Sequence, residues 1–405
     1  MKIGVWLNEQ VLPTMGGGAS YTLRLLSLLD KYEFSDGIRI CYVSIFPVNA
    51  LNKECYNISQ IPHFVYYFFS WSKFFTNFLR KLDKKIISIK GLRKVLRGTD
   101  IKMIYYILGS NVMDLDSSFP FIATNWDIGH RSTYPFPELC NNMIFESRDK
   151  FYMSILPKAM MIICESETGK KELIDYTNIG AYKIRVMPLF SGGVSTLNLS
   201  DGVMKEILKK LGIERNRFFY YPAQFWPHKN HYGLLKAFQK FIQDNKNYFL
   251  VLSGSDKGNL TYIKNVANEL DICDKVLFLG FISEEEVYTL YKNATCLVMA
   301  SHFGPTNMPP IEAMELGCPV ACTDLGGHRE ILEESAVYFD SFDDNSIYNA
   351  LVEITHHRDI YINRISKQKK LTIFNPDNAI RCLDKILTEA VNIRKNWDES
   401  NSQMH

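Results

Sequence analysis

The sequence predicts an α/β protein built from two doubly wound domains that face each other across a central cleft. Short apolar runs alternate with amphipathic helical stretches, which is the pattern of a parallel sheet covered by helices. The alternation runs through the chain twice, and a segment rich in Ser, Gly and Asn at 190–202 separates the two series. The length of 405 residues, of which 46% are hydrophobic, is enough for two or three domains with cores of their own.

The first series begins with the apolar run KIGVWL, which predicts a strand at 2–7. The glycine-rich GGGAS at 16–20 follows as a turn, and the spacing of its leucines predicts a helix over 21–29. The remaining apolar runs of this half predict strands at 38–45, 103–107, 121–124, 160–164 and 183–187. We expect this first domain to cover residues 1–195.

The second series predicts a domain over residues 203–375. Its apolar runs predict strands at 218–223, 248–254, 276–281, 296–301 and 319–323, with helices from about 231, up to about 270 and near 284–291 between them. A last helix within 376–396 is expected to pack back on the first domain. In open α/β sheets, ligands bind beyond the carboxyl ends of the strands, so the cleft between the domains is the expected site.

Composition excludes several classes of protein. Lys and Arg number 46 against 44 Asp and Glu, and the resulting charge of +2 argues against a nucleic-acid partner. The nine cysteines are scattered and form no CxxC pair, so neither a disulfide framework nor a zinc ribbon is expected, and a reducing cytosol is the better compartment. The sequence shows no signal peptide and no uncharged apolar stretch of about 20 residues, so we expect a cytoplasmic protein.

Two features carry phosphate-binding chemistry. Gly17 and Gly18 precede a helix, whose exposed N–H groups and positive dipole end suit a diphosphate, although a tight structural turn explains the same glycines equally well. Lys229 lies just past the end of a strand in QFWPHKNH, where a lysine neutralises a phosphate as a point charge. A solvated lysine at a helix start is the alternative.

The segment 301–332 is the most informative of the chain. Its loop at 303–310 contains one glycine and three prolines before a short helix that carries Glu312, and such a loop presents backbone amides to an anion. Glu312 is placed to accept hydrogen bonds from ribose hydroxyl groups. After the next strand, Gly326 and Gly327 repeat the device that lets a backbone approach a ligand closely.

The motif WDIGHR at 126–131 follows a predicted strand, so Asp127, His130 and Arg131 are expected at a strand end that faces the cleft. His130 would bind a sugar hydroxyl or a phosphate, and Asp127 would hold the acceptor hydroxyl. A structural hydrogen-bonding role is the alternative for both.

On these residues the chain resembles the family 4, or group 1, glycosyltransferases of the GT-B fold, which have two Rossmann-like domains and use nucleotide sugars. The highly specific match is PPIEAMELGCPV at 309–320. The loop FGPTNMPP and the motif WDIGHR resemble a recognised subset of these enzymes. The similarity extends through most of the chain and includes the N-terminal strand with its glycine turn, CESET at 164–168, YPAQFWPHKN at 221–230 and GFISEEEVYTLYKNA at 280–294.

The resemblance assigns roles residue by residue. The family's loop carries two glutamates eight positions apart; Glu312 matches the second, implied to hold the donor ribose, and the first falls on Gly304. The family's phosphate-binding Arg/Lys pair matches Gln224 and Lys229, and the active-site histidine of many members aligns with Trp126. The expected catalytic residues are Asp127 and His130. The expected donor-binding residues are Gly17, Gly18, Arg131, Gln224, Lys229, Phe281, Gly304, Thr306, Asn307, Met308 and Glu312.

The implied reaction is the retaining transfer of a sugar from a nucleotide diphosphate donor to a hydroxyl acceptor, with no metal or other cofactor. No pair of carboxylates at a motif offers the arrangement of a glycoside hydrolase, which fits front-face attack assisted by the leaving phosphate. Two alternatives stay open: a nucleotide-sugar epimerase of GT-B fold, and a degenerate, non-catalytic partner of a true transferase, suggested by the losses at Gly304 and Gln224.

The segment 71–97 stands apart because it holds nine basic residues and one acidic residue, a net charge of +8. Trp71, Phe75, Phe78, Leu82, Ile86 and Ile89 recur at steps of three and four and predict one apolar helical stripe. A helix of this kind lies in a membrane interface and is attracted by anionic lipid. We therefore expect a peripheral protein of the inner membrane face whose acceptor is a lipid-linked or growing cell-surface glycan. A helix packed on the first sheet with a solvated basic face is the alternative.

Overall fold

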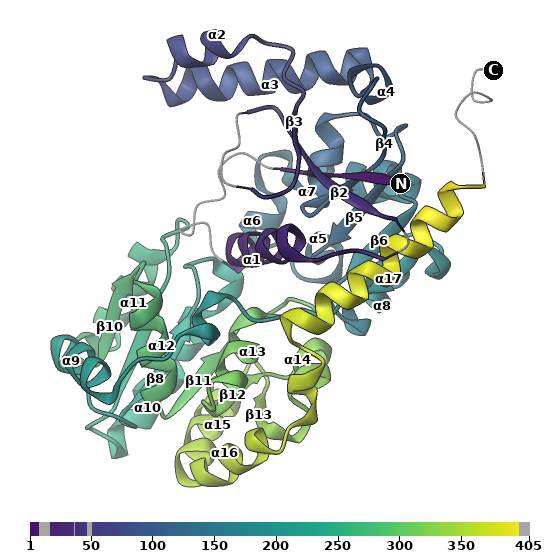
Figure 1. Cartoon of the computed structure of the whole chain (residues 1–405). Helices are drawn as coiled ribbons and strands as arrows, with labels where there is room; N and C mark the ends of the chain where they lie inside the picture. Colours follow the sequence, from purple (N-terminus) through teal and green to yellow (C-terminus); the bar gives the residue numbers. More distant parts are fainter. Residues whose placement is uncertain (8–16, 36, 47–50, 397–405) are drawn as a thin grey trace.

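The computed structural model describes residues 1–7, 17–35, 37–46 and 51–396, which form two α/β domains (Figure 1). Within the described residues, the N-terminal domain holds a seven-stranded parallel sheet in the order β3-β2-β1-β4-β5-β6-β7. The strands are β1 (Lys2–Trp6), β2 (Arg39–Ser44), β3 (Cys55–Asn57), β4 (Ile101–Tyr106), β5 (Phe121–Asn125), β6 (Met161–Cys164) and β7 (Ile184–Val186).

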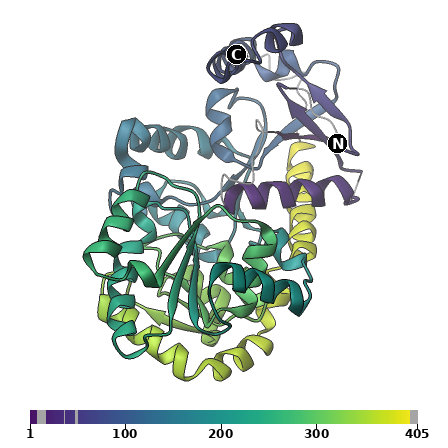
Figure 2. The same ribbon diagram turned by 90° about the vertical axis from the view of Figure 1, so that its left-hand side faces the viewer.

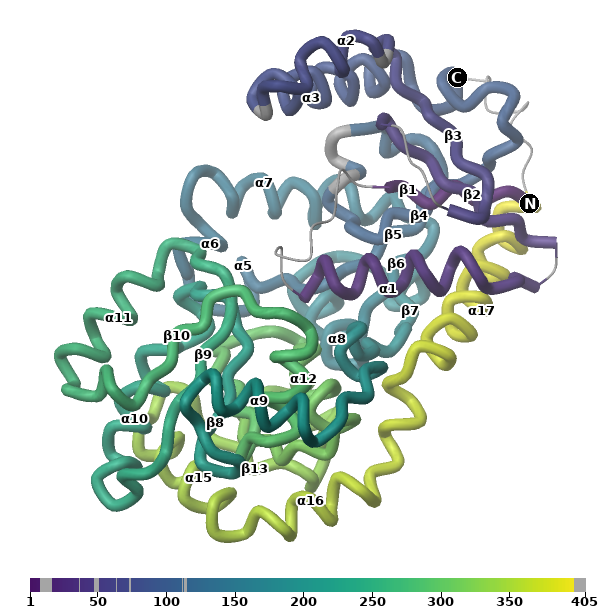
Figure 3. Tube along the Cα trace, turned by 60° about the vertical axis from the view of Figure 1, so that its left-hand side comes forward, coloured from purple at the N-terminus to yellow at the C-terminus, as the bar shows by residue number. Residues whose placement is uncertain are grey.

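The helices of this domain lie on both faces of its sheet, except for two that stand at its outer margin. They are α1 (Gly17–Lys31), α2 (His63–Phe68), α3 (Lys73–Lys90), α4 (Leu92–Val95), α5 (Gly129–Ser132), α6 (Pro137–Cys140), α7 (Ile144–Lys150) and α8 (Glu167–Tyr176). The two at the margin are α2 and α3, which form a hairpin beyond the sheet (Figures 1 and 3).

The C-terminal domain holds a six-stranded parallel sheet in the order β10-β9-β8-β11-β12-β13, counted over the described residues. Its strands are β8 (Phe218–Pro222), β9 (Phe249–Ser253), β10 (Val276–Gly280), β11 (Cys296–Met299), β12 (Val320–Thr323) and β13 (Ala336–Phe339). The helices that follow are α9 (Asp201–Leu211), α10 (His231–Asp244), α11 (Leu260–Glu269), α12 (Glu284–Asn293), α13 (Met308–Glu315), α14 (Gly326–Leu332), α15 (Asp344–His356), α16 (Arg358–Ser366) and α17 (Pro376–Arg394).

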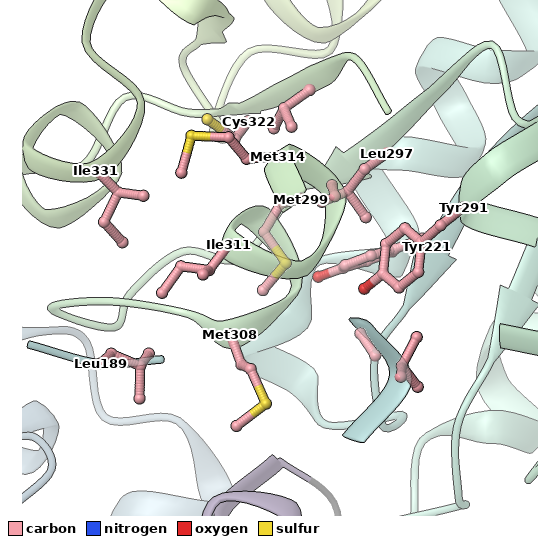
Figure 4. Packing of buried hydrophobic residues seen from close by; sticks show 14 of the residues in the cluster. Leu189, Tyr221, Tyr291, Leu297, Met299, Met308, Ile311, Met314, Cys322 and Ile331 are labelled. Carbon is pink, nitrogen blue, oxygen red and sulfur yellow. The ribbon is translucent and has the colours of Figure 1, made fainter. Parts of the chain in front are cut away.

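The core explains why these runs form strands. All four residues of β6 and of β12 are buried, as expected for parallel strands covered by helices on both faces. Figure 4 shows the packing beside β11 and β12, where Ile311 of α13 lies near Met299 and Met314 lies near Cys322. The predicted fold class is confirmed, because both sheets are parallel and doubly wound.

The structure corrects two local predictions. The turn expected at 16–20 is not a turn over its described part, because α1 begins at Gly17, while Gly16 lies outside the described residues. Burial of Ala19, Tyr21 and Leu25 against the sheet outweighs the weak helix propensity of the two glycines. Strands β3 and β13 were not predicted; β3 has three residues, none of them buried, so no alternation marks it.

Two segments connect the domains. The segment 190–202 contains a short 3₁₀ turn at Gly193–Thr196, and Phe190 in it is buried against Tyr21 of α1, with ring centroids 4.6 Å apart. Helix α17 returns from the C-terminal domain and packs against α1, which it crosses at a steep angle (Figures 2 and 3). There the Asp384 carboxylate accepts hydrogen bonds from the backbone N and Oγ of Ser35, at 3.0 and 2.7 Å.

Candidate functional site

A cavity of about 550 Å³ lies between the two domains, at the carboxyl ends of both sheets. The N-terminal domain lines it with the start of α1 and with residues that follow β5 and β6. The C-terminal domain lines it with residues that follow β8, β9, β10 and β11 and with the first turn of α13. The polar or charged side chains of the lining are Asp127, Glu165, Gln224, His228, Lys229, Ser253, Ser255, Thr306 and Asn307, together with Trp126 and Trp226.

Lys229 forms the cationic part of the cavity wall. Its Nζ donates hydrogen bonds to Asn307 Oδ1 at 3.2 Å and to Ser301 Oγ at 3.3 Å. Burial lowers the pKa of Lys229 to about 8, because the charged ammonium is poorly solvated there. Among the described residues no carboxylate forms an ion pair with this ammonium, so a bound anion would be its natural partner.

A buried histidine fixes the orientation of Asn307. His328 Nδ1 lies 2.7 Å from the carbonyl oxygen of Thr323, which can only accept, so the proton must be on Nδ1. The other ring nitrogen, Nε2, therefore accepts from Asn307 Nδ2 at 3.0 Å. The amide oxygen of Asn307 is thereby turned toward Lys229, and the ammonium is held at the cavity.

Two further N–H groups of the lining have no hydrogen-bond partner among the described residues. Gln224 Oε1 accepts from Trp226 Nε1 at 3.1 Å, which leaves Gln224 Nε2 as an unused donor. Trp126 Nε1 is likewise unpaired, while its ring packs edge-on against Tyr21 with centroids 4.5 Å apart. Buried donors without partners are costly, so these two N–H groups are candidates for hydrogen bonds to an acceptor other than the described residues.

The loop 303–308 closes one side of the cavity. Gly304 has a φ of +131°, a conformation that L side chains rarely adopt, so the glycine is required by the backbone. Thr306 Oγ1 donates a hydrogen bond to Glu165 Oε1 across the domain boundary. Gly304, Thr306, Asn307 and Met308 all line the cavity, as expected of residues that face a ligand.

Gly326 and Gly327 do not line the cavity, which corrects the prediction that they approach a ligand. A Cβ atom at Gly327 would lie 1.2 Å from the carbonyl oxygen of Pro305. The backbone at Gly327 thus closely approaches the loop 303–308 and not a ligand, because α14 packs against that loop.

The N-terminal domain contributes Asp127 and the start of α1. Gly17 and Gly18 line the cavity as the first residues of a 15-residue helix, so its N–H groups and positive dipole end face the space. Asp127 Oδ1 accepts from the backbone N of Gly129 at 2.8 Å and forms an ion pair with Arg148. The carboxylate is therefore held in a fixed position at the cavity wall.

His130 and Arg131 are not among the residues that line the cavity. The His130 ring is buried against Tyr152 and Phe145, and its Nδ1 accepts from Arg148 Nε at 3.3 Å. Burial, and next the charge of Arg148, lower the pKa of His130 to about 4, so the ring is neutral near pH 7. Arg131 lies outside and pairs with Asp149 at 2.5 Å.

Glu312 also lies just behind the lining. Its Oε2 accepts from the Tyr291 hydroxyl at 2.9 Å, and its Oε1 accepts a longer bond of 3.3 Å from the backbone N of Gly192. Burial raises the pKa of Glu312 to about 7. Phe281, in contrast, lines the cavity and is 56% exposed, which leaves a flat aromatic surface at its rim.

The sequence analysis missed Glu165 and Arg148. Glu165 lines the cavity and directly follows β6, much as Asp127 follows β5 with only Trp126 between them, so its place after a strand was the available signal. Arg148 lies in α7 without a recognisable motif, and nothing in the sequence distinguishes it. Two carboxyl groups therefore share the cavity, although no motif of the sequence pairs them.

The C-terminal domain matches a known family. Residues 203–371 match the family described as "Glycosyl transferases group 1". Over these residues the chain is similar to the group 1 glycosyltransferases, and the whole chain has the GT-B fold.

Two of the curated relatives are mannosyltransferases of an O-antigen chain by their names. The chain is similar to the O-antigen chain mannosyltransferase RfbU of Salmonella typhimurium, with 29% identity over 210 residues, which cover 51% of this chain and 55% of the relative. It is also similar to the O-antigen chain mannosyltransferase B of Escherichia coli, with 24% identity over 193 residues, 47% of this chain and 50% of the relative. The chain thus spans about half the length of the curated relatives it matches.

Solved structures resemble the fold over nearly the whole chain. A glycosyltransferase from Rickettsia africae ESF-5 has a TM-score of 0.68 and 14% identity, and the match covers 96% of this chain and 98% of that one. Anabaena HepE in complex with UDP-glucose also has a TM-score of 0.68 and 14% identity, covering 97% of this chain and 100% of that one. At these identities the likeness establishes the GT-B fold alone.

Proposed function

We propose that this chain is a retaining glycosyltransferase that moves a sugar from a nucleotide diphosphate donor to a hydroxyl group of a glycan. One observation carries the proposal: the interdomain cavity is lined by Lys229, Gln224 and Trp126. Among the described residues, no carboxylate forms an ion pair with the buried lysine, and one N–H group of each of the other two has no partner. This donor set matches a diphosphate, which is the anion that must be held and released in the reaction.

The arrangement supports a defined division of labour. The phosphates would lie against Lys229 and Gln224, with the start of α1 opposite them, and the base would lie on Phe281 at the rim. Glu312 would take a ribose hydroxyl in place of the long bond from Gly192. Asp127, on the N-terminal side, would position the acceptor hydroxyl, and His130 would act through Arg148 by keeping the Asp127 carboxylate in place.

The chemistry follows from where charge develops. As the bond between the sugar and the diphosphate breaks, negative charge grows on the leaving phosphate, and donors fixed beforehand stabilise it without reorganisation. The acceptor hydroxyl attacks the sugar from the face that the diphosphate leaves, so the configuration is retained. The proton of the hydroxyl passes to the leaving phosphate oxygen. The second carboxyl group, Glu165, is largely protonated near neutral pH because burial raises its pKa to about 8, so it does not act as a nucleophile.

The names of the relatives support a hexose as the transferred sugar and a bacterial surface glycan as the acceptor. The α2–α3 hairpin supports a lipid-linked form of this acceptor on the inner face of the membrane. The predicted apolar stripe of 71–97 does not pack on the sheet: within the described residues of α3, the buried side chains are Asp83 and Ile87 alone. The alternative of a helix packed by its apolar face is therefore disfavoured.

The exposed side of this hairpin is strongly aromatic. Six aromatic side chains of α2, α3 and their connection are each more than half exposed: Phe64, Tyr67, Phe68, Trp71, Phe74 and Phe78. Soluble proteins seldom expose this many large apolar side chains on two neighbouring helices without a partner. Together with the charge of +8 over 71–97, this surface suits an anionic lipid interface. No helix within the described part of the chain has the length and apolarity needed to span a bilayer.

The test of the proposed function is nucleotide binding by calorimetry, with UDP, GDP and dTDP as probes. We predict that Lys229→Ala weakens the preferred nucleoside diphosphate about tenfold or more, because a hydrogen bond to a charged group is worth roughly 1.5–3 kcal/mol. Lys240→Ala is the matched control, since that lysine of α10 does not line the cavity and its Nζ donates to Asn345 Oδ1.

Equal affinity in the wild type and in Lys229→Ala would contradict the phosphate assignment. Product analysis of the wild type then separates the remaining functions. A new glycosidic bond in the presence of acceptor supports a transferase, exchange of the sugar epimer without acceptor indicates an epimerase, and binding without turnover of any donor indicates a non-catalytic partner.

A further inference from the structure

The two carboxyl groups of the cavity have different surroundings. Asp127 forms an ion pair with the Arg148 guanidinium. Glu165 is buried with 7% of its surface exposed, and within the described residues it forms no ion pair. Its partner is the hydroxyl group of Thr306, and burial raises its pKa to about 8. Near pH 7 Glu165 is therefore mostly a neutral carboxylic acid, which both donates and accepts hydrogen bonds.

Glu165 brings a carboxyl group to the loop 303–308, which carries none at Gly304. At Gly304, the φ of +131° would strain the backbone of any residue with a side chain, so a carboxyl group is disfavoured at this position of the loop. Glu165 brings one to the same loop from the other domain, two residues further along at Thr306. Both Glu165 and Thr306 line the cavity, so the carboxyl group meets the loop at the space where a ligand would lie.

The rest of the lining assigns this place to the sugar. The groups suited to phosphate, Lys229 and Gln224, belong to the C-terminal domain, and Phe281 lies at the rim for the base. The acceptor has to approach from the N-terminal side, where Asp127 lies. A hexose attached to the diphosphate would lie between these two groups, where its hydroxyls need partners that can donate as well as accept.

We propose that Glu165 is a specificity-determining residue that hydrogen-bonds hydroxyl groups of the transferred sugar, from the domain opposite to the one that holds the nucleotide. This inference rests on the proposed function. It makes recognition of the sugar depend on the two domains being together, because the nucleotide is bound by one domain and the sugar is checked by the other. The hydrogen bond from Thr306 Oγ1 shows that the Glu165 carboxyl group can pair with a hydroxyl group at this place.

The experiment compares two affinities in each variant: that for the preferred nucleoside diphosphate and that for the matching nucleotide hexoses, including UDP-glucose. We expect Glu165→Ala to leave nucleoside diphosphate affinity within about twofold of wild type and to lower affinity or kcat for the nucleotide sugar about tenfold. The differences in affinity between the hexose donors should also become smaller in this variant. Glu165→Gln, which keeps one donor and one acceptor, should lose less. The matched control is Glu167→Gln, because the Glu167 side chain is 68% exposed just beyond the same strand.

A second readout excludes a purely structural role. If Glu165 only anchors the loop through Thr306, then Glu165→Ala and Thr306→Val will weaken the nucleoside diphosphate and the nucleotide sugar by the same factor, and the proposal is overturned. Unchanged sugar affinity, kcat and hexose preference in Glu165→Ala also overturn it. Under the proposal, sugar preference changes between pH 7 and 9 in the wild type, where Glu165 ionises, and stays constant in Glu165→Gln. A wild type that binds no nucleoside diphosphate would instead refute the proposed function.

Discussion

Lys229 is a buried lysine with which no carboxylate of the described residues forms an ion pair, so nucleotide binding should depend on its protonation and hence on pH. Burial lowers its pKa to about 8, so its charge is lost as the pH rises through that value. The negative charge of a bound diphosphate would raise the pKa of Lys229 again. Above pH 8, Lys229 therefore takes up a proton when the diphosphate binds. We predict that nucleoside diphosphate affinity falls about tenfold from pH 7 to pH 9, since one pH unit beyond the pKa leaves about a tenth of the lysine protonated.

Calorimetry in buffers of different ionisation enthalpy measures both this loss and the proton uptake. Lys229→Arg is the control, because a guanidinium stays protonated over the whole range. Its affinity should be nearly constant between pH 7 and 9, whether or not it equals that of the wild type. A slope in Lys229→Arg as steep as in the wild type would assign the titration to another group, of which Glu165 is the first candidate.

Single residues also show how far sequence reasoning reaches. Lys229, Gln224 and Asp127 could be placed at the cavity because each follows a strand, and the carboxyl ends of parallel strands share one edge of a sheet. His130 could not be placed in the same way. Three residues further along, α5 has begun, and the side chain turns into the core against Tyr152, a contact that only the packed structure reveals.

At the scale of elements, α14 supports the loop 303–308 by close contact at Gly327. A Cβ atom there would lie 1.2 Å from the Pro305 carbonyl oxygen, so the backbone of one of the two segments has to move. We predict that Gly327→Ala destabilises the protein by about 1–3 kcal/mol, the usual cost of overpacking, and weakens nucleoside diphosphate binding because Asn307 and Lys229 shift with the loop. Thermal unfolding and calorimetry measure the two effects.

Gly317→Ala is a suitable control for that variant. Gly317 ends α13 at a φ of +72°, with no atom within 4 Å of a Cβ built there, so its substitution strains the backbone without touching the loop. It should lower stability and leave nucleotide affinity unchanged. A Gly327→Ala protein that binds nucleotide as the wild type does would show that the loop position does not depend on α14.

The elements themselves were largely predictable, and the exceptions have physical reasons. Long apolar runs such as 218–223 and 248–254 became central strands because complete burial needs an unbroken apolar run. Strand β3 lies at the sheet edge with three residues, and its pairing with β2 is decided by the neighbouring strand rather than by its own sequence. In place of the predicted glycine turn, α1 begins at Gly17, four residues earlier than expected, because its first turn also packs on the sheet.

At the scale of the whole molecule, the two domains are joined by contacts that no pattern in the sequence predicts. The Glu330 carboxylate of α14 accepts hydrogen bonds from the backbone N of Glu167 and of Thr168, each at 2.9 Å, at the start of α8. Near the cavity, Glu138 of α6 accepts from the backbone N of His228 at 3.1 Å. Each contact joins residues 90 or more positions apart, and each depends on how the domains are turned toward one another.

The outermost part of the molecule gives the last prediction. The α2–α3 hairpin is anchored around Asp83 of α3, whose carboxylate accepts from the Tyr66 hydroxyl of α2 at 2.9 Å and from the backbone N of Gln60, just before α2, at 2.8 Å. Beyond this anchor its aromatic side chains are exposed. We predict that the protein floats with vesicles of phosphatidylglycerol at low salt and is released at high salt, because attraction between surface charges is screened.

Two pairs of substitutions separate the contributions to this binding. Trp71→Ser with Phe74→Ser should weaken it at every salt concentration, because aromatic burial in the interface is lost, whereas Lys81→Glu with Lys85→Glu should remove mainly its salt dependence. Tyr182→Ser is the control, since Tyr182 is 75% exposed elsewhere on the same domain. Flotation that is equal with neutral phosphatidylcholine, or that is absent with both lipids, would contradict the docking surface and make a soluble acceptor the better proposal. Retained flotation in Tyr182→Ser with loss in the hairpin variants would place the contact on α2 and α3, with the acceptor side of the cavity in the domain that meets the lipid.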